Sequence, residues 1–374
     1  MSVSVLYPRY DHPAVEERYA SWQTQMLLRA SGAEVLFHDE VDDVETEYVL
    51  VVTDPLLLPS RNLPQRLVSV IGAADAAVPV TNEPADERQR AGERAPYVTL
   101  RELQTVFDSF ERAPARTERI QWTDTDPGAF LCRTAFLKKV KGPLRNAIVG
   151  RNVVVSHNDY IHRWSSMRGQ ARVDLLDRIP AGATSLLEFG CGEAPLGAAI
   201  KERQKCRVVG IELDPRAAAV ARKRIDDVYQ GDVREIVSLI HERFDWIVGG
   251  DIVEHLDEPW SFLADLRRIS KPGGHLLLSL PNLANVSIVN DLLRGRFDYV
   301  YMGLTCAGHL RFFTRRTIED MLDIAGWKVE SIESQPVILT PDAEELLAKL
   351  DASGTDFSRD DLLAPGYYVT AVNR

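Results

Sequence analysis

The sequence predicts two α/β domains, the second built on a doubly wound, mostly parallel sheet with an antiparallel C-terminal edge. Three observations support this prediction. The chain has 374 residues, which is long for a single hydrophobic core. From about residue 184, apolar strand patterns alternate with helical patterns, as in open parallel sheets. Two strand patterns then close the chain without a βα-type crossover between them, which favours antiparallel pairing.

The first domain is expected over residues 1–150 and the second over residues 151–374. The first region is α/β in character, because strand patterns at 33–37 and 47–52 are accompanied by helical stretches. The polar, proline-bounded segment 81–96 predicts a loop.

The second domain is predicted element by element. A helical lead-in is expected first, at 160–180; such segments often fold over a bound cofactor, so Tyr160, His162 and Arg168 are candidate contacts. Asp257 is expected to cap the helix that begins at Pro259. Strands are expected at 185–189, 206–213, 227–232, 244–250, 274–282, 327–332 and 366–372, and further helices at 215–225, 235–244, 259–270 and 314–327.

Charge and cysteine content exclude several classes of protein. The formal net charge of −11 disfavours general nucleic-acid binding, because an acidic surface repels phosphates. The four cysteines contain no Cys-x-x-Cys pair, so neither a disulfide framework nor a structural zinc site is expected. The sequence contains no signal-peptide pattern and no apolar run long enough to span a membrane, and a cytoplasmic location is expected.

A glycine loop, LLEFGCGEAPLG at 186–197, follows the first strand of the second domain, where open α/β sheets bind ligands. Gly190 and Gly192 allow a tight turn and the close approach of a ligand. The loop lacks the Gly-Lys-Ser/Thr ending of a P-loop. Pro195 occupies the third glycine position of a dinucleotide fingerprint. The glycines alone are weak evidence, so the flanking residues must identify the ligand.

Acidic residues follow the neighbouring strands. Glu212 ends the second strand and can accept hydrogen bonds from both hydroxyls of a ribose. Asp232 ends the third strand and can accept from an adenine amine, while the Val233 N–H can donate to a ring nitrogen. Glu188 can face a cation. This acidic set suits a cationic adenosyl ligand better than a pyrophosphate.

Together with VVGIELDP, GDV, FDWIVGGDIVEHLDEP and ISKPGGHLLLSLPN, the glycine loop resembles class I S-adenosylmethionine-dependent methyltransferases, over about residues 155–374. The resemblance implies a Rossmann-like, seven-stranded sheet and S-adenosyl-L-methionine as cofactor. Ala194 departs from it, because many members have a third glycine there, and tuned rather than lost affinity is expected. The implied cofactor contacts are Glu188, Gly190, Cys191, Gly192, Glu212, Leu213, Asp232, Val233, Gly249 and Asp251.

The acceptor is expected under the insertion at 294–327, which follows the fifth strand. Its HLRFFT segment, 309–314, is similar to methyltransferases associated with bacterial cell-surface glycan assembly. Arginines and tyrosines suit an anionic or hydroxylated acceptor, such as a sugar on a nucleotide or lipid carrier. A solvated lid with structural aromatic residues is the alternative. The candidate acceptor-binding residues are Arg294, Arg296, Tyr299 and Arg311.

The stretch GGDIVEHLDEP at 249–259 places Asp251, Glu254 and His255 within one turn, if the segment is helical. Some relatives, including ubiquinone-pathway and small-RNA 2′-O-methyltransferases, have an acid-x-x-Glu-His element here. In the small-RNA group these residues and a downstream histidine hold a divalent cation, and His309 matches that histidine. Three roles stay open. The residues could hold a metal, provide a general base at His255 or His309 with Glu254 beside it, or only cap and pack.

The first domain carries a partial resemblance to glycosyltransferase A-type domains, at 47–80 and 126–140. The Asp-x-Asp metal motif of that fold is missing, since Asp54 stands alone in VVTDP. A degenerate, inactive module that binds a glycan or a glycan-assembly partner is expected. An unrelated accessory domain is the alternative.

The resulting prediction is a methyltransferase that methylates a sugar hydroxyl of a polysaccharide or glycoconjugate precursor. Three alternatives stay open. The acceptor could be a small molecule of quinone or secondary metabolism, the methylated atom could be nitrogen, or the protein could be a non-catalytic scaffold that binds the cofactor without turnover.

Overall fold

The computed structural model describes residues 2–9, 14–55, 57–60, 62–82, 89–91, 96–122, 126–139, 143–144, 147–149, 151–163 and 172–373. Their contacts divide the chain into two compact units, each with its own sheet. Unit 1 comprises Met1–Ser166, Asp298–Met302 and Cys306–Gly308, and unit 2 comprises Met167–Phe297, Gly303–Thr305 and His309–Arg374.

Unit 1 contains a mixed sheet of the order β2-β1-β3-β7-β5-β8-β4, in which β6 also pairs with β8. Strand β7 runs antiparallel to both of its neighbours, β3 and β5. The strands are β1 (Val3–Tyr7), β2 (Glu34–Phe37), β3 (Tyr48–Val52), β4 (Leu57–Pro59), β5 (Ala76–Thr81), β6 (Thr117–Gln121), β7 (Ala129–Arg133) and β8 (Asn152–Arg163).

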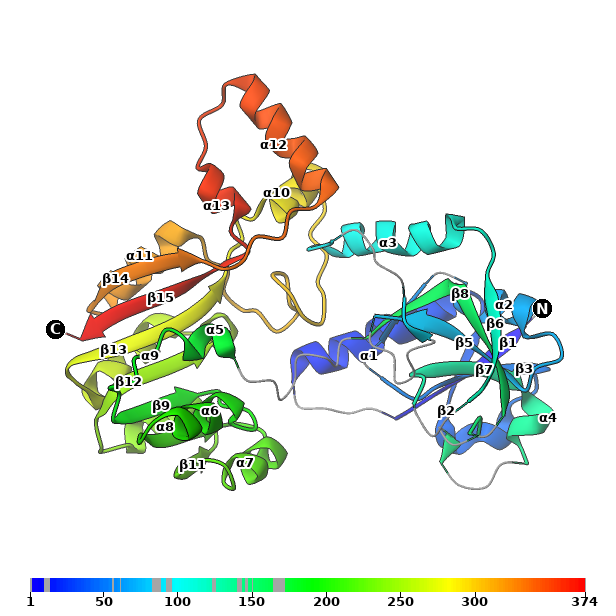
Figure 1. Cartoon of the computed structure of the whole chain (residues 1–374), viewed down its shortest axis with the longest axis horizontal. Coiled ribbons are helices and arrows are strands. Elements are labelled where there is room, and N and C mark those ends of the chain that lie inside the picture. Colours follow the sequence, from blue (N-terminus) through cyan, green and yellow to red (C-terminus); the bar gives the residue numbers. More distant parts are fainter. Residues whose placement is uncertain are drawn as a thin grey trace. The chain divides into compact units, whose positions relative to one another are not determined.

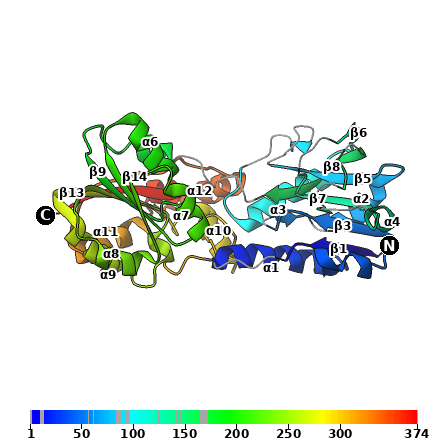
Figure 2. The same cartoon turned by 90° about the horizontal axis from the view of Figure 1, so that it is seen from below.

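Helices cover both faces of this sheet, which is why β1, β3 and β5 are buried along their whole length. Helix α2 (Leu63–Ile71) packs on one face and α3 (Leu100–Arg112) on the other. The long helix α1 (Val15–Ala30) runs along the sheet (Figure 2). A four-residue helix, α4 (Thr134–Leu137), follows β7.

Unit 2 contains a seven-stranded sheet of the order β11-β10-β9-β12-β13-β15-β14 (Figure 1). Strands β9 to β13 are parallel to one another. Strand β15 is antiparallel to both β13 and β14. The predicted fold class, including the antiparallel edge, is confirmed. The strands are β9 (Ser185–Phe189), β10 (Arg207–Glu212), β11 (Asp227–Gln230), β12 (Phe244–Gly250), β13 (Ser270–Pro281), β14 (Trp327–Ser334) and β15 (Gly366–Asn373).

Two layers of helices enclose the second sheet. One face is covered by α8 (Val233–Leu239), α9 (Pro259–Leu266) and α11 (Arg315–Ile324). The other face is covered by α5 (Val173–Leu176), α6 (Pro195–Arg203) and α7 (Pro215–Ala221). Among the described residues, no helix combines the length and the apolar character needed to cross a bilayer.

Three local predictions are wrong. Residues 160–163 continue strand β8, because they pair with β4 and β5, and are not part of a helical lead-in. Asp257 does not cap α9; Glu258 is the N-cap residue, and the Asp257 carboxylate pairs with Arg234 instead. The helix expected at 235–244 ends at Leu239, because Phe244 already begins β12. Arg168 and the side chains of Tyr160 and His162 lie outside the described part.

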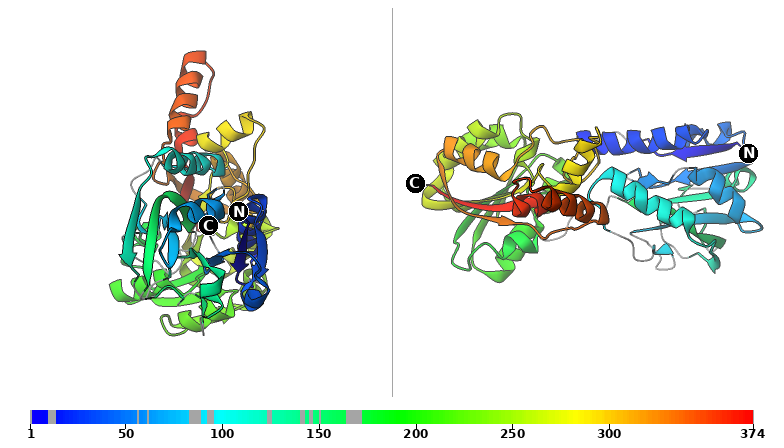
Figure 3. Two further views of the ribbon diagram at one scale, coloured as in Figure 1. Left: turned by 90° about the vertical axis from the view of Figure 1, so that its right-hand side faces the viewer. Right: turned by 90° about the horizontal axis from the view of Figure 1, so that it is seen from above.

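Two helices that the sequence reading did not predict lie between β14 and β15. They are α12 (Pro341–Ser353) and α13 (Arg359–Leu363). Helix α12 packs beside α10 (Val286–Leu293) (Figures 1 and 3). The buried Asn282 side chain, just after β13, donates to the carbonyls of Asp361 and Ala364. The α12–α13 segment therefore contacts the sheet at the carboxyl ends of its parallel strands.

Candidate active site

The predicted cofactor contacts gather at one edge of the unit 2 sheet, because the carboxyl ends of parallel strands meet there. The loop after β9 needs glycine at Gly190, where φ is 70° and a Cβ atom would lie 2.3 Å from Ile252 Cδ1. Gly192 also has a positive φ, of 56°. At Gly249, at the end of β12, a Cβ would lie 1.9 Å from Phe189 Cζ.

Ala194 adopts a conformation that favours glycine. Its φ is 55°, and it is the buried N-cap residue of α6. A left-handed conformation costs a non-glycine residue about 1–2 kcal/mol. The chain therefore keeps the loop geometry despite lacking the third glycine.

Glu212 joins the glycine loop to the end of β10. Its Oε2 atom accepts from the Gly192 N–H at 2.7 Å, and its Oε1 accepts from the Asp214 N–H at 2.8 Å. A carboxylate oxygen can accept more than one hydrogen bond, so both oxygens can still receive a hydroxyl. Next to it, Leu213 is 64% exposed, and its contact with the cofactor stays a prediction.

Hydrogen bonds favour the ionised form of Asp232 at the start of α8. Its carboxylate accepts from the Arg234 backbone N–H at 2.9 Å and from the Arg234 guanidinium at 2.9 and 2.5 Å. These side-chain hydrogen bonds from Arg234 lower the pKa of Asp232. Arg234, which the sequence reading did not single out, also pairs with Asp257, and the buried Val233 follows Asp232.

Glu188 is a buried carboxyl group with an unmet hydrogen-bonding capacity. Its Oε2 atom has no hydrogen-bond partner among the described residues. Burial, with a smaller contribution from Glu212, raises the pKa of Glu188 to about 8. A cation beside this carboxyl would favour its ionised form. The observed chemistry therefore fits the sulfonium and ammonium charges of S-adenosylmethionine. Burial also raises the thiol pKa of the neighbouring Cys191, which disfavours its nucleophilic thiolate form.

We expect Glu188→Gln to stabilise the ligand-free protein and to weaken cofactor binding. A carboxyl whose pKa is raised in the folded state stabilises the fold below its unfolded pKa, near 4.5, and this contribution is lost as pH rises toward about 8. Glutamine avoids that loss, so unfolding at neutral pH should cost about 1–3 kcal/mol more. Denaturant unfolding and calorimetry with S-adenosylhomocysteine measure the two effects. Lower stability of the variant at neutral pH would contradict this account.

Asp251 does not extend toward the other acids of its motif. It has a φ of 55°, its Oδ2 atom pairs with Arg172 Nη1 at 2.6 Å, and its Oδ1 accepts from Ser279 Oγ at 2.7 Å. Arg172 also pairs with Asp174 at 2.8 Å. The guanidinium lies beside Gly250, where a Cβ would be 3.2 Å from Nη1. Arg172, which was not among the predicted site residues, therefore fixes the Asp251 carboxylate at the end of β12.

Three of the four proposed metal ligands come together. Ligand atoms of Glu254, His255 and His309 lie within 4.8 Å of one another, whereas Asp251 is outside this group. His309 Nε2 is 3.8 Å from Glu254 Oε1, and the two imidazole ring centroids are 4.9 Å apart. We call these three residues the Glu-His-His cluster.

Glu254 is the most unusual member of the Glu-His-His cluster. It is 1% exposed, and neither carboxylate oxygen has a hydrogen-bond partner among the described residues. Burial and then the Asp251 charge raise its pKa well above the ordinary value. Burial and the nearby His255 lower the pKa of His309 to about 4. At neutral pH the cluster therefore offers a neutral His309 imidazole beside a buried carboxyl group.

The four predicted acceptor residues are divided between the two units. In unit 2, Arg294 bonds back to Asn290, the Arg296 backbone N–H donates to the Asp291 carbonyl, and Arg311 donates to the Asp257 carbonyl. Tyr299 belongs to unit 1, and its carbonyl accepts from Tyr19. Acceptor binding by these four residues stays a prediction.

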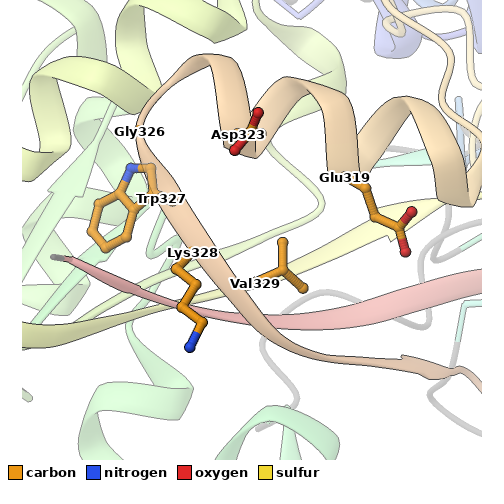
Figure 4. A pocket seen from close by; sticks show the side chains of 6 residues that line it. All are labelled: Glu319, Asp323, Gly326, Trp327, Lys328 and Val329. Atoms are coloured by element: carbon orange, nitrogen blue, oxygen red, sulfur yellow. The ribbon is translucent and has the colours of Figure 1, made fainter.

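A separate pocket of about 330 Å³ lies between α11 and β14 (Figure 4). Its walls include Glu319 and Asp323 on the helix and Lys328 on the strand. Trp327, which begins β14, pairs with Asn373 at the end of β15, so this pocket is at the amino edge of the parallel strands. It is therefore not part of the candidate active site.

The sheet order, the glycine loop and the acids at the strand ends define a class I S-adenosylmethionine-dependent methyltransferase domain. In agreement, residues 159–332 match a family described as "Methyltransferase domain". This domain implies S-adenosylmethionine as the methyl donor.

Named relatives are similar to part of the chain. A ubiquinone biosynthesis O-methyltransferase of Cereibacter sphaeroides is 24% identical over 173 residues, which cover 45% of this chain and 69% of the relative. A probable S-adenosylmethionine-dependent methyltransferase of Mycolicibacterium smegmatis is 29% identical over 147 residues, covering 39% of this chain and 52% of the relative. The crystal structure of a SAM-dependent methyltransferase from Archaeoglobus fulgidus has a TM-score of 0.40 and 18% identity, covering 54% of this chain and 91% of that one.

Proposed function

We propose that this protein is an O-methyltransferase in which the Glu-His-His cluster holds a divalent cation beside the acceptor hydroxyl. The observation that carries this proposal is the buried Glu254 carboxyl group, whose two oxygens have no hydrogen-bond partner among the described residues while two imidazoles lie close by. Carboxylates bind Mg²⁺ and Mn²⁺, and imidazoles are typical ligands of divalent ions such as Zn²⁺ and Fe²⁺, so the mixed cluster suits a divalent cation. A cation held there would supply a Lewis acid that makes a nearby hydroxyl more acidic.

In the proposed reaction, the acceptor oxygen displaces the thioether of S-adenosylmethionine. The new O–CH₃ bond forms as the S–CH₃ bond breaks, and the hydroxyl proton leaves to a base. A His255 imidazole that binds the cation has no lone pair left for this proton, so the proton leaves to solvent water. His255 or His309 is the base in the alternative reaction without a cation. Glu188, Glu212 and Asp232 are proposed to hold the cofactor so that the methyl group faces this cluster, and accurate alignment supplies much of the rate.

For the acceptor, we propose a sugar hydroxyl of a glycoconjugate precursor. The proposal rests on the likeness of the 309–314 segment to glycan-assembly methyltransferases. A sugar hydroxyl is less acidic than a phenol, so it gains more from a Lewis acid. The relatives named as ubiquinone biosynthesis enzymes favour a quinone-type phenol as the second candidate. Mass spectrometry of a methyl-transfer screen, with sugar nucleotides in one panel and catechols in the other, separates the two.

Unit 1 is proposed to be a degenerate glycosyltransferase A-type module that binds a glycan or a glycan-assembly partner. The supporting features are the likeness at 47–80 and 126–140, and the single Asp54 after β3 where the Asp-x-Asp motif would stand. Glycan-array binding by the full chain tests this assignment.

The cation proposal predicts that a chelator abolishes methyl transfer and that Mg²⁺ or Mn²⁺ restores it. Because burial raises the pKa of Glu254, cation binding competes with protonation of this carboxyl group. Cation affinity should therefore increase with pH, by at most about tenfold per pH unit. Calorimetric Mn²⁺ titrations at about pH 6 and about pH 8 measure this. Full activity in the presence of excess chelator would refute the proposal.

A further inference from the structure

Arg172 lies directly before α5 and joins this helix to the end of β12. Its guanidinium group reaches two carboxylates on different segments of unit 2. Nε donates to Asp174 Oδ1 at 3.0 Å and Nη2 donates to Asp174 Oδ2 at 2.8 Å, while Nη1 donates to Asp251 Oδ2 at 2.6 Å. An arginine side chain suits this double contact, because its donors point in fixed directions.

The Asp174 side of this contact is anchored to the sheet. The Tyr368 hydroxyl, on β15, donates to Asp174 Oδ2 at 2.8 Å, and Tyr368 is buried. The guanidinium of Arg178 lies over the Tyr368 ring, 3.7 Å from its centroid. The sheet therefore fixes Asp174, and Asp174 in turn fixes the direction of the Arg172 side chain.

The Asp251 carboxylate is held by a second group as well. Ser279, which has no exposed surface on β13, donates from Oγ to Asp251 Oδ1 at 2.7 Å and accepts from Arg172 Nη2 at 3.2 Å. The φ of Asp251 is 55°, a left-handed conformation that a non-glycine residue adopts at a cost. The side-chain bonds offset that cost, so they hold both the carboxylate and the backbone at the end of β12.

Gly250 allows Arg172 to come this close to the strand end. A Cβ atom at Gly250 would lie 3.0 Å from Leu175 Cδ1 and 3.2 Å from Arg172 Nη1. A side chain there would therefore push α5 and its arginine away from β12. The Gly-Asp pair at 250–251 thus matches Arg172, although 77 residues separate the two segments.

We propose that Arg172 is a positioning residue for the cofactor, because it fixes the Asp251 carboxylate that receives the ammonium group at the methionine end. Each Asp251 oxygen accepts one hydrogen bond, from Arg172 or from Ser279, and can accept another. The Asp251 side chain is 46% exposed, so a ligand can reach it. A carboxylate whose direction is already set loses little rotamer freedom when the ligand binds. The proposal rests on the cofactor site of the proposed function and does not depend on the cation.

Arg172→Gln tests the proposal, with S-adenosylhomocysteine affinity measured by calorimetry. The variant removes the charged group that holds Asp251, and we expect about tenfold weaker binding. Asp251→Asn should weaken binding by a similar factor. Because Arg172 acts through Asp251, adding Arg172→Gln to Asp251→Asn should weaken binding by less than about twofold more. Arg172→Lys keeps the charge but loses the fixed fork, so it should restore part of the affinity.

Arg203→Gln is the matched control. Arg203 donates from Nη1 to the Leu176 carbonyl at 2.8 Å and from Nη2 to the Ile179 carbonyl at 2.7 Å. It therefore anchors the far end of the same helical segment without reaching Asp251. Its S-adenosylhomocysteine affinity should equal that of the wild type. Equal weakening by Arg203→Gln would assign the effect to a loosened α5 and overturn the proposal.

Wild-type affinity in folded Arg172→Gln protein would also overturn the proposal, and so would two single effects that multiply to about a hundredfold in the double variant. If the wild type itself does not bind S-adenosylhomocysteine, the cofactor site of the proposed function fails, and the positioning role fails with it. Should Arg172→Gln not fold, Arg172→Lys replaces it. We then expect about threefold weaker binding for Arg172→Lys alone and no further weakening beside Asp251→Asn.

Discussion

Glu254→Gln is expected to abolish Mn²⁺ binding and to reduce kcat by about 100-fold or more, whereas S-adenosylhomocysteine affinity stays within about twofold. The amide removes the negative ligand of the Glu-His-His cluster. It has nearly the same shape as the protonated carboxyl group, which burial already favours at this position. The variant should therefore fold as well as the wild type. Calorimetry and single-turnover methyl transfer measure the two losses.

Glu258→Gln is a matched control for this experiment. It makes the same chemical change four residues further on, at an exposed position before α9. Its Mn²⁺ binding and turnover should equal those of the wild type. Wild-type turnover in Glu254→Gln would exclude a catalytic cation at this cluster and leave packing as the role of Glu254.

Glu212→Gln is expected to weaken S-adenosylhomocysteine binding by about 100-fold. Both carboxylate oxygens of Glu212 accept from backbone N–H groups, of Gly192 and Asp214. In the variant one of these N–H groups must face an amide NH₂, so one loop contact and one ribose acceptor are lost together. Each hydrogen bond to a charged group contributes about 1.5–3 kcal/mol, which makes two such losses worth 100-fold or more.

Calorimetry measures this affinity, and Glu202→Gln on the exposed side of α6 is the control that should bind as tightly as the wild type. Denaturant unfolding shows whether the loop still folds. Affinity unchanged by Glu212→Gln would mean that the ribose does not bind at the end of β10.

The part of the site that local sequence predicts is the cofactor side. Strands β9, β10 and β12 are continuous apolar runs, and each ends at the residues that were singled out. The strand order brings Glu188, Glu212 and Asp232 to one edge, as expected from parallel pairing. The contacts of Arg172 and Arg234 were not predicted, because each guanidinium reaches a carboxylate on another element. Arg172 pairs with Asp251, 79 positions away, and Arg234 pairs with Asp257, 23 positions away.

The secondary-structure errors have a common cause. Residues 160–163 form a strand because β4 and β5 provide partners for their backbone. The α12–α13 segment is held by Asn282, which is distant in sequence. Local propensity is a weak guide wherever partners from far along the chain supply the hydrogen bonds.

By itself, the sequence determined the class of the second domain, since periodicity, glycine spacing and acids at strand ends are all properties of short segments. Only the tertiary structure decided how the residues of the Asp-x-x-Glu-His motif at 251–255 separate. Asp251 turns to Arg172 and Ser279, whereas Glu254 is buried beside His255 and His309. The physical reason is desolvation: a carboxyl group becomes a strong candidate ligand only when the fold removes it from water without giving it a partner, and that depends on packing between distant residues.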